Sequence, residues 1–203
     1  LLRDGMAGIG TVTYYDPATG SYGALGHSIN DPASGSVLSL SGGIITEAQV
    51  ADVLPGKAGQ ARELHGVFDT NVQLGSVLLN TAQGIFGRTN AWAGREAIPA
   101  AAEGEIADGP AVILANISGD EVCEYAVNIS KSGERLLVTV TDDALLSATG
   151  GIVQGMRGCP IIQNGKLVGA VTHVLVNDPA RGYGIPIYSM LEAAEEVAGQ
   201  PAA

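Results

Sequence analysis

The hexapeptide GMRGCP, which runs from Gly155 to Pro160, has a spacing that suits acyl-transfer chemistry. Glycines at Gly155 and Gly158 let the backbone bend sharply without Cβ clashes, so that the residue between them is exposed and successive amides point into one hole. Such a hole stabilises an oxyanion when a hydroxyl three residues before the proline attacks a carbonyl, as in the pattern Gly-x-Ser-Gly-x-Pro. The residue at that place is Arg157, so the sequence predicts the turn without its nucleophile.

A hydroxyl nucleophile also needs a base within hydrogen-bond reach and a carboxylate that holds the base in the right tautomer. His27, in GALGHSINDP, follows a short β-like run and precedes a polar turn, which predicts an imidazole at a strand end facing a cleft. His65 and His173 lie inside strand-like runs, where a hydrogen-bonded structural histidine is the expected role. His27 is therefore the candidate base.

The elements that must position these residues are short strands. GTVTYYD places Val12 and Tyr14 on one face and the residues between them on the other, the period of two that is typical of a half-buried strand. DPATG then predicts a hairpin turn, and NGK predicts another beyond the GMRGCP turn. Only SMLEAAEEVAG has helical signals, with Ser189 as N-cap and Gly199 as the stop.

These elements predict an all-β fold with a C-terminal helix. We expect an N-terminal β-barrel over residues 1–97, a linker over residues 98–110, and a C-terminal β-barrel with the terminal helix over residues 111–203. The linker, IPAAAEGEIADGP, is acidic and has no clear periodicity. Two β-rich halves of similar length would suit a pair of barrels within one domain.

Composition narrows the class of protein. Hydrophobic residues at 46% and charged residues at 15% exclude a disordered chain, and 29 glycines with 4% aromatic residues predict short strands joined by tight turns. A net charge of −11 opposes nucleic-acid binding, and no apolar stretch is long enough to span a bilayer. Because the chain opens on Leu1 and not on methionine, we expect it to be a fragment. Cys123 and Cys159 permit one disulfide or two free thiols.

Two blocks of sequence resemble the sporulation factor IV B serine peptidase family of endospore-forming bacteria. They are RDGMAGIGTVTYYDPATGSYGALGH and TGGIVQGMRGCPIIQNGKLVGAVTHVLVNDPARGYGI. The resemblance implies a chymotrypsin-like double β-barrel endopeptidase that needs no metal or organic cofactor. It assigns the base to His27, the carboxylate to Asp142 or its neighbour Asp143, and the nucleophile to the position of Arg157. Gly155 and Arg157 would then supply the oxyanion hole.

The resemblance also implies a place and a partner. Members of this family are secreted or membrane-anchored outside the cytoplasm, in the space between forespore and mother cell. They act in sigma-factor-processing signalling by cleaving a regulator of a membrane-embedded protease. The expected partner is therefore a protein or peptide substrate, and segments absent from this chain would hold any membrane anchor.

Arg157 is the departure from the family pattern. A guanidinium stays protonated and has no free lone pair with which to attack a carbonyl, so acyl-enzyme chemistry through residue 157 is excluded. We expect Arg157 to pair with Asp142 and to lie against His27, where it fills the space of a substrate carbonyl. Because residue 157 is no nucleophile, the sequence predicts an inactive pseudoenzyme. Three alternatives stay open: a non-catalytic peptide-binding scaffold, a protease that uses Cys159, and a substitution introduced into a protein that naturally has serine.

The segment VNDPARGYGI follows the strand after the turn and would border a specificity pocket, with Asn177, Asp178 and Gly182 as its candidate residues. Asn177 and Asp178 before a proline are also ordinary turn formers. Arg181 is expected to be solvated.

Overall fold

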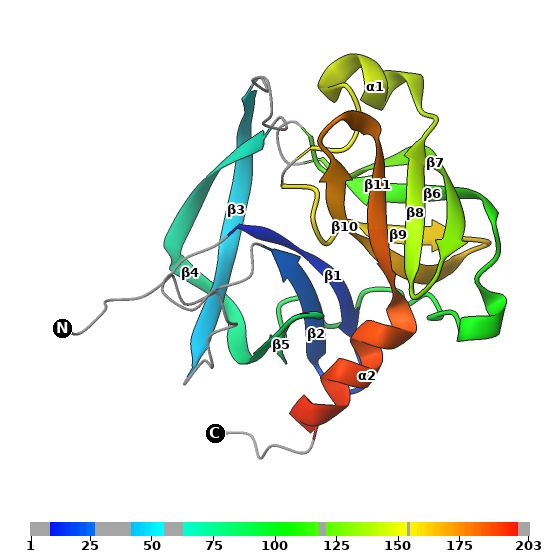
Figure 1. Ribbon diagram of the computed structural model, residues 1–203. Helices are drawn as coiled ribbons and strands as arrows, with labels where there is room; N and C mark the ends of the chain where they lie inside the picture. The colour runs from blue at the N-terminus through cyan, green and yellow to red at the C-terminus, as the bar shows by residue number, and fades with distance from the viewer. Residues whose placement is uncertain (1–8, 27–41, 55–62, 118–120, 154, 199–203) are drawn as a thin grey trace, which may run out of the picture.

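The computed structural model describes residues 9–26, 42–54, 63–117, 121–153 and 155–198. His27 lies outside these ranges, and so does the side chain of His65. The described chain folds into two β units with a helix at their junction (Figure 1).

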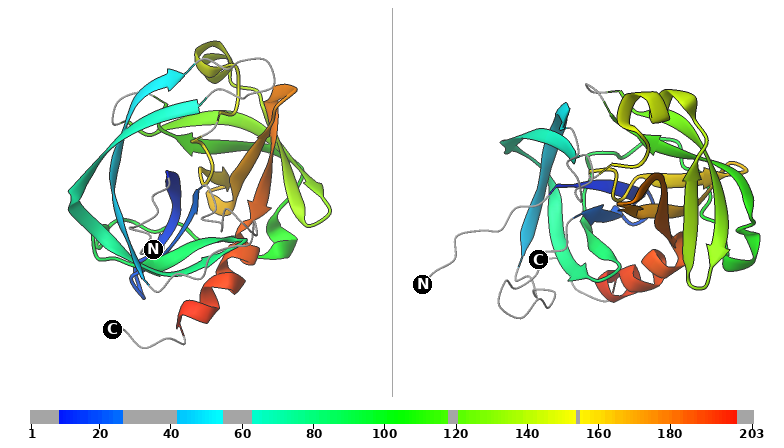
Figure 2. Two further views of the ribbon diagram at one scale, coloured as in Figure 1. Left: turned by 60° about the vertical axis from the view of Figure 1, so that its left-hand side comes forward. Right: turned by 45° about the horizontal axis from the view of Figure 1, so that its top comes forward.

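The first unit is a five-stranded antiparallel sheet in the order β1-β2-β5-β4-β3. Its strands are β1 (Gly10–Asp16), β2 (Ser21–Gly26), β3 (Gly43–Leu54), β4 (Glu63–Thr81) and β5 (Gly84–Arg88). The predicted turn after β1 is confirmed, since Gly20 has φ 71° and its N–H donates to the Asp16 carbonyl at 2.8 Å. The long β3 and β4 form one edge of this sheet and are strongly curved (Figure 2).

The second unit is a closed barrel in the order β10-β11-β8-β7-β6-β9. Its strands are β6 (Gly109–Ala115), β7 (Cys123–Ser132), β8 (Arg135–Val140), β9 (Pro160–Gln163), β10 (Lys166–Leu175) and β11 (Asp178–Pro186). The predicted NGK hairpin joins β9 to β10, with Asn164 at φ 52° and Gly165 at φ 74°. Two positive φ angles in succession are the geometry of a tight two-residue hairpin turn, which Asn-Gly favours.

Two α-helices and a short 3-10 helix (Glu103–Glu105) complete the described chain, and the first α-helix was not expected. The helix α1 (Asp143–Thr149) begins after Asp142 and ends at Gly150, which adopts the left-handed conformation. The terminal helix α2 (Ile187–Ala198) begins directly after Pro186, so the expectation of Ser189 as N-cap is wrong and Ser189 lies inside the helix. Neither helix among the described residues has the length and apolarity that a membrane span requires.

A small apolar cluster joins the two units and α2. Leu25 and Phe86 come from the first sheet, Leu167 from the barrel, and Ile187 and Met190 from α2; each is buried. Residues 99–101 also run beside the start of β10, where the Ala101 N–H donates to the Leu167 carbonyl at 2.8 Å. The predicted chymotrypsin-like architecture of two β units and a C-terminal helix is confirmed, with the first unit present as a curled five-stranded sheet.

Candidate functional site

The turn from Gly155 to Pro160 lies where the two β units meet. Gly155 has φ 105° and Gly158 has φ 94°, so both occupy backbone conformations that favour glycine. A Cβ added to Gly158 would lie 2.4 Å from the Thr11 carbonyl oxygen and 2.8 Å from the Leu25 carbonyl oxygen. The first sheet therefore presses directly on the backbone of the turn, and only glycine leaves room for this contact.

The main chain of the turn is anchored to β10. The Gly158 N–H donates to the Val171 carbonyl at 2.7 Å, and the Val171 N–H donates to the Cys159 carbonyl at 3.0 Å. Within the turn, the Cys159 N–H donates to the Met156 carbonyl and the Met156 N–H to the Val153 carbonyl. The N–H groups of Gly155 and Arg157 make no backbone hydrogen bond to any residue that the structure describes.

Two hydroxyls of β1 hold the same turn from the other side. Thr13 is buried, and its Oγ1 donates to the Gly158 carbonyl at 2.8 Å. Thr11 Oγ1 donates to the Gly155 carbonyl over a longer 3.5 Å. The turn is thus fixed by both β units, as a rigid support for a reactive group requires.

Cys159 lies in the interior of this junction. Both cysteines are free thiols, and Cys159 is 3% exposed. Burial raises the pKa of the Cys159 thiol to about 12, although a hydrogen bond with Thr11 acts in the opposite direction. Because the thiolate is the nucleophilic form, this environment opposes the Cys159-dependent protease that the sequence left open.

Arg157 is half-buried in the turn and poorly satisfied. Its Nε is buried without a hydrogen-bond partner, and burial lowers the pKa of the guanidinium. The ion pairs among the described residues join Lys166 to Glu105 and Arg181 to Asp178, and neither includes Arg157. The expected pairing of Arg157 with Asp142 is therefore wrong in the structure.

Asp142 has a different set of partners. Its Oδ1 accepts the Leu145 N–H at 2.9 Å as the N-cap of α1, and its Oδ2 accepts the Ala126 N–H at 3.2 Å. These backbone donors lower the pKa of Asp142, so its carboxylate is ionised at neutral pH. The neighbouring Asp143 is exposed in the first turn of α1.

His173, for which the sequence predicted only a structural role, lies close enough to the turn to feel the charge of Arg157. It is exposed on β10, with its Nδ1 3.0 Å from Thr172 Oγ1 and its ring centroid 5.2 Å from that of Tyr183. Burial lowers the pKa of His173, and the positive charges of Arg135 and Arg157 lower it further. The signal in the sequence was the hairpin after the turn, which returns the chain alongside residues 158 and 159 at Val171, two residues before His173.

The candidate pocket residues occupy different parts of the β10–β11 hairpin. Gly182 is buried on β11, and a Cβ there would lie 2.7 Å from the His173 carbonyl oxygen and 2.8 Å from Ile152 Cδ1. Asn177 is exposed in the connecting turn, while Asp178 forms an exposed ion pair with Arg181 at 3.8 Å. Gly182 thus lies beside the segment that leads into the turn, and the roles of Asn177 and Asp178 stay predictions.

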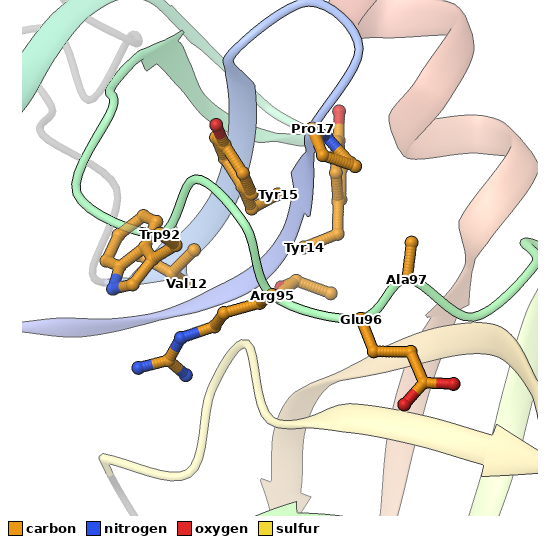
Figure 3. Close-up of a pocket in the computed structure, with 9 residues that line it drawn as sticks. Val12, Tyr14, Tyr15, Pro17, Trp92, Arg95, Glu96 and Ala97 are labelled. Atoms are coloured by element: carbon orange, nitrogen blue, oxygen red, sulfur yellow. The ribbon is translucent and has the colours of Figure 1, made fainter.

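A concave feature away from the turn lies between β1 and the chain that follows β5. It encloses about 350 Å³ and has Trp92 and Arg95 toward one end and Glu96 and Ala97 toward the other (Figure 3). The Trp92 ring meets the Tyr15 ring edge-on, with centroids 5.9 Å apart. The sequence did not predict this cavity. No cluster of three acidic, histidine or cysteine side chains suited to a metal occurs within the described ranges.

Both the sequence and the fold of this chain are similar to those of known proteins. The family model described as SpoIVB peptidase S55 matches residues 1–191. Among solved structures, the chain is similar to the crystal structure of Rv3671c from M. tuberculosis H37Rv, in the inactive form of a serine-to-alanine mutant. The two share 14% sequence identity and a TM-score of 0.48, over 80% of this chain and 87% of that chain. No curated protein matches the sequence.

Proposed function

The chain belongs to the SpoIVB peptidase S55 family, and from this membership we propose that it is a peptidase domain that no longer cleaves its substrate. The observation that carries the proposal is Arg157 at the position of the attacking hydroxyl. A guanidinium cannot form an acyl-enzyme ester. Loss of a nucleophile leaves roughly 10³-fold catalysis over water from the remaining parts of a site, which is several orders of magnitude below a working protease.

The remaining parts of the turn support a site that has lost only its nucleophile. The glycines at Gly155 and Gly158 retain their positive φ angles, and the turn keeps its hydrogen bonds to β1 and β10. The N–H groups of Gly155 and Arg157 have no backbone acceptor among the residues described, as an oxyanion hole requires. We propose His27 as the base and Asp142 as the carboxylate that would serve a serine at residue 157.

One property of Asp142 supports its assignment as the carboxylate that orients His27, and another opposes it. Its carboxylate is ionised, as a residue that orients a histidine must be. Each of its oxygens also accepts a backbone N–H, which leaves fewer lone pairs for an imidazole. Asp143, exposed at the start of α1, is the second candidate for the same role.

A non-catalytic peptide-binding scaffold is the second candidate function. The observation that favours it is the buried Nε of Arg157, which lacks a partner in the described protein and is therefore a donor free for a ligand. A domain of this kind would act in the signalling that accompanies spore formation, outside the cytoplasm between forespore and mother cell. Its partner would be a regulator of a membrane-embedded protease, bound but not cut.

Intact-mass analysis after incubation with an unstructured protein substrate tests the proposal. We expect the unsubstituted domain to leave the substrate intact and the Arg157→Ser variant to cut it. Adding His27→Ala to each protein is the matched control, since cleavage that depends on a serine–histidine pair must disappear in the double variant. Cleavage by the unsubstituted domain that requires His27 would refute the proposed lack of activity.

A further inference from the structure

We propose that the turn around Arg157 binds the C-terminal carboxylate of a peptide, with the Arg157 side chain and the N–H groups of Gly155 and Arg157 as donors. This inference rests on the proposed function, because it assigns a ligand to a turn that no longer cleaves. It identifies the partner by its chemistry as a peptide chain end, of the kind that another protease produces when it hydrolyses a peptide bond.

The first step of the argument is the unmet hydrogen bonding of Arg157. Its Nε is shielded from solvent and donates to no acceptor in the described protein. Buried polar groups in native structures are nearly always hydrogen-bonded, so an orphaned donor at a candidate site points to a missing acceptor. A carboxylate suits this donor best, because guanidinium and carboxylate form paired, charge-assisted hydrogen bonds.

The second step is that the described protein does not supply this carboxylate. Asp142 is engaged with two backbone N–H groups, Glu105 pairs with Lys166, and Asp178 pairs with Arg181. The chain has a net charge of −11 and therefore many carboxylates, but the ion pairs among the described residues do not include Arg157. Among the residues that the structure describes, no carboxylate pairs with the guanidinium, and the carboxylate of a ligand would satisfy it.

The third step is that two arginine side chains, Arg135 and Arg157, lie near His173 on β10. Arg135 lies over the Tyr183 ring, with its Cζ 5.8 Å from the centroid, and the Tyr183 ring is tilted against that of His173. The charges of Arg135 and Arg157 both lower the pKa of His173, which means that both act at the same point on β10. A ligand with a negative charge is favoured at such a point.

The fourth step distinguishes a chain end from an acidic side chain. The N–H groups of Gly155 and Arg157 lie in the backbone of the turn, on either side of Met156, whose own N–H is taken up by Val153. In a working site such amides receive the oxygen of a main-chain carbonyl. A C-terminal carboxylate presents one oxygen to these amides and a second to the guanidinium, and it needs no side chain to reach them.

Fluorescence anisotropy with matched peptides tests this inference. The probe is fluorescein-Gly-Ala-Val-Ala-Leu with a free C-terminal carboxylate, and its partner is the same peptide with a C-terminal amide. A third peptide, also an amide, has Glu in place of its central Val. We expect the free acid to bind about tenfold more tightly than either amide, as for one added charge-assisted interaction.

The Arg157→Gln variant is expected to lose this tenfold preference, since glutamine keeps a polar side chain without the positive charge. Arg181→Gln is the matched control, because Arg181 is an exposed arginine paired with Asp178 on the same hairpin. Equal affinity for the free acid and its plain amide would overturn the inference. Arg157-dependent binding confined to the Glu peptide would overturn the assignment to a chain end.

A second measurement uses His173 as a reporter. Binding of the free-acid peptide neutralises the charge of Arg157, so the pKa of His173 measured by NMR should rise in the complex, and the amide peptide should leave it unchanged. Failure of the proposed function has a different signature, namely cleavage of an unstructured substrate by the unsubstituted domain. If the Arg157→Ser variant cuts the substrate, but the unsubstituted domain binds the free-acid and amide peptides equally well, the proposed function stands and this inference is refuted.

Discussion

Gly158→Ala is the substitution that most directly tests whether the first sheet presses on the turn. The new Cβ would lie 2.4 Å from the Thr11 carbonyl oxygen and 2.8 Å from that of Leu25, both of which are backbone atoms with strands behind them. Alanine would also have to adopt φ 94°. The overlap can be relieved only if β1 and β2 move away from the turn or the turn itself moves.

The expected loss of stability follows from these contacts. The positive φ angle costs an L-residue about 1–2 kcal/mol. Separation of β1 from the turn also breaks the buried hydrogen bond from Thr13 Oγ1 to the Gly158 carbonyl, which is 2.8 Å long, and a buried group left unsatisfied costs about 1–3 kcal/mol. Together these effects predict a decrease of about 2–5 kcal/mol in the free energy of unfolding.

Gly165→Ala is the matched control for the backbone effect. Gly165 has φ 74°, and a Cβ there would meet nothing within 4 Å, so this variant should lose only about 1–2 kcal/mol. Urea unfolding followed by circular dichroism measures both variants against the unsubstituted domain. Equal destabilisation by the two substitutions would refute the close contact between the first sheet and the turn.

Two further predictions concern single side chains near the site. Asp142→Ala should lower the free energy of unfolding by about 1 kcal/mol at neutral pH, because the helix α1 loses its N-cap. The pKa of Asp142 is lowered from the ordinary 3.8 in the folded state, so its contribution is present above that value and is lost as the pH falls through the lowered pKa. Urea unfolding of both proteins at neutral and acidic pH should show the difference narrowing, and a difference independent of pH would contradict the role of the ionised carboxylate. In the native protein, an aromatic disulfide reagent should modify the half-buried Cys123 and leave Cys159 unmodified, because burial holds the Cys159 thiol at a pKa of about 12. Mass spectrometry of the labelled protein distinguishes the two sites, and rapid labelling of Cys159 would show that it is accessible.

Much of the fold could be predicted from residue patterns that act locally. Asn164 and Gly165 form the predicted hairpin, and the turn that ends at Gly20 closes as the prolines and glycines there indicate. The helix α1 was missed because it is only 7 residues long and its N-cap, Asp142, was considered only for its chemistry. Ser189 is not the N-cap because the helix α2 begins at Ile187, directly after β11 ends at Pro186 and earlier than the polar signal suggests.

The candidate site was predictable only in part, for a physical reason. The glycines and Arg157 are adjacent in sequence, so their turn could be recognised from spacing alone. The contact of Thr13 with the turn depends on how the two β units pack, and the electrostatic effect of Arg157 on His173 depends on how β10 is bonded to the turn; no local pattern specifies either. The pairing of Arg157 with Asp142 was expected from opposite charge, but the Asp142 carboxylate instead accepts the backbone N–H groups of Leu145 and Ala126.

The way in which the turn is anchored bears on how such a domain could change over evolutionary time. Its hydrogen bonds to β1 and β10 use the backbone of residues 155, 158 and 159 and the hydroxyls of Thr11 and Thr13, and none of them uses the side chain at residue 157. Replacement of that side chain therefore leaves the anchoring bonds intact. In a protein built in this way, a mutation in one codon can change the chemistry of the site while the fold persists. Catalysis and folding can therefore evolve independently.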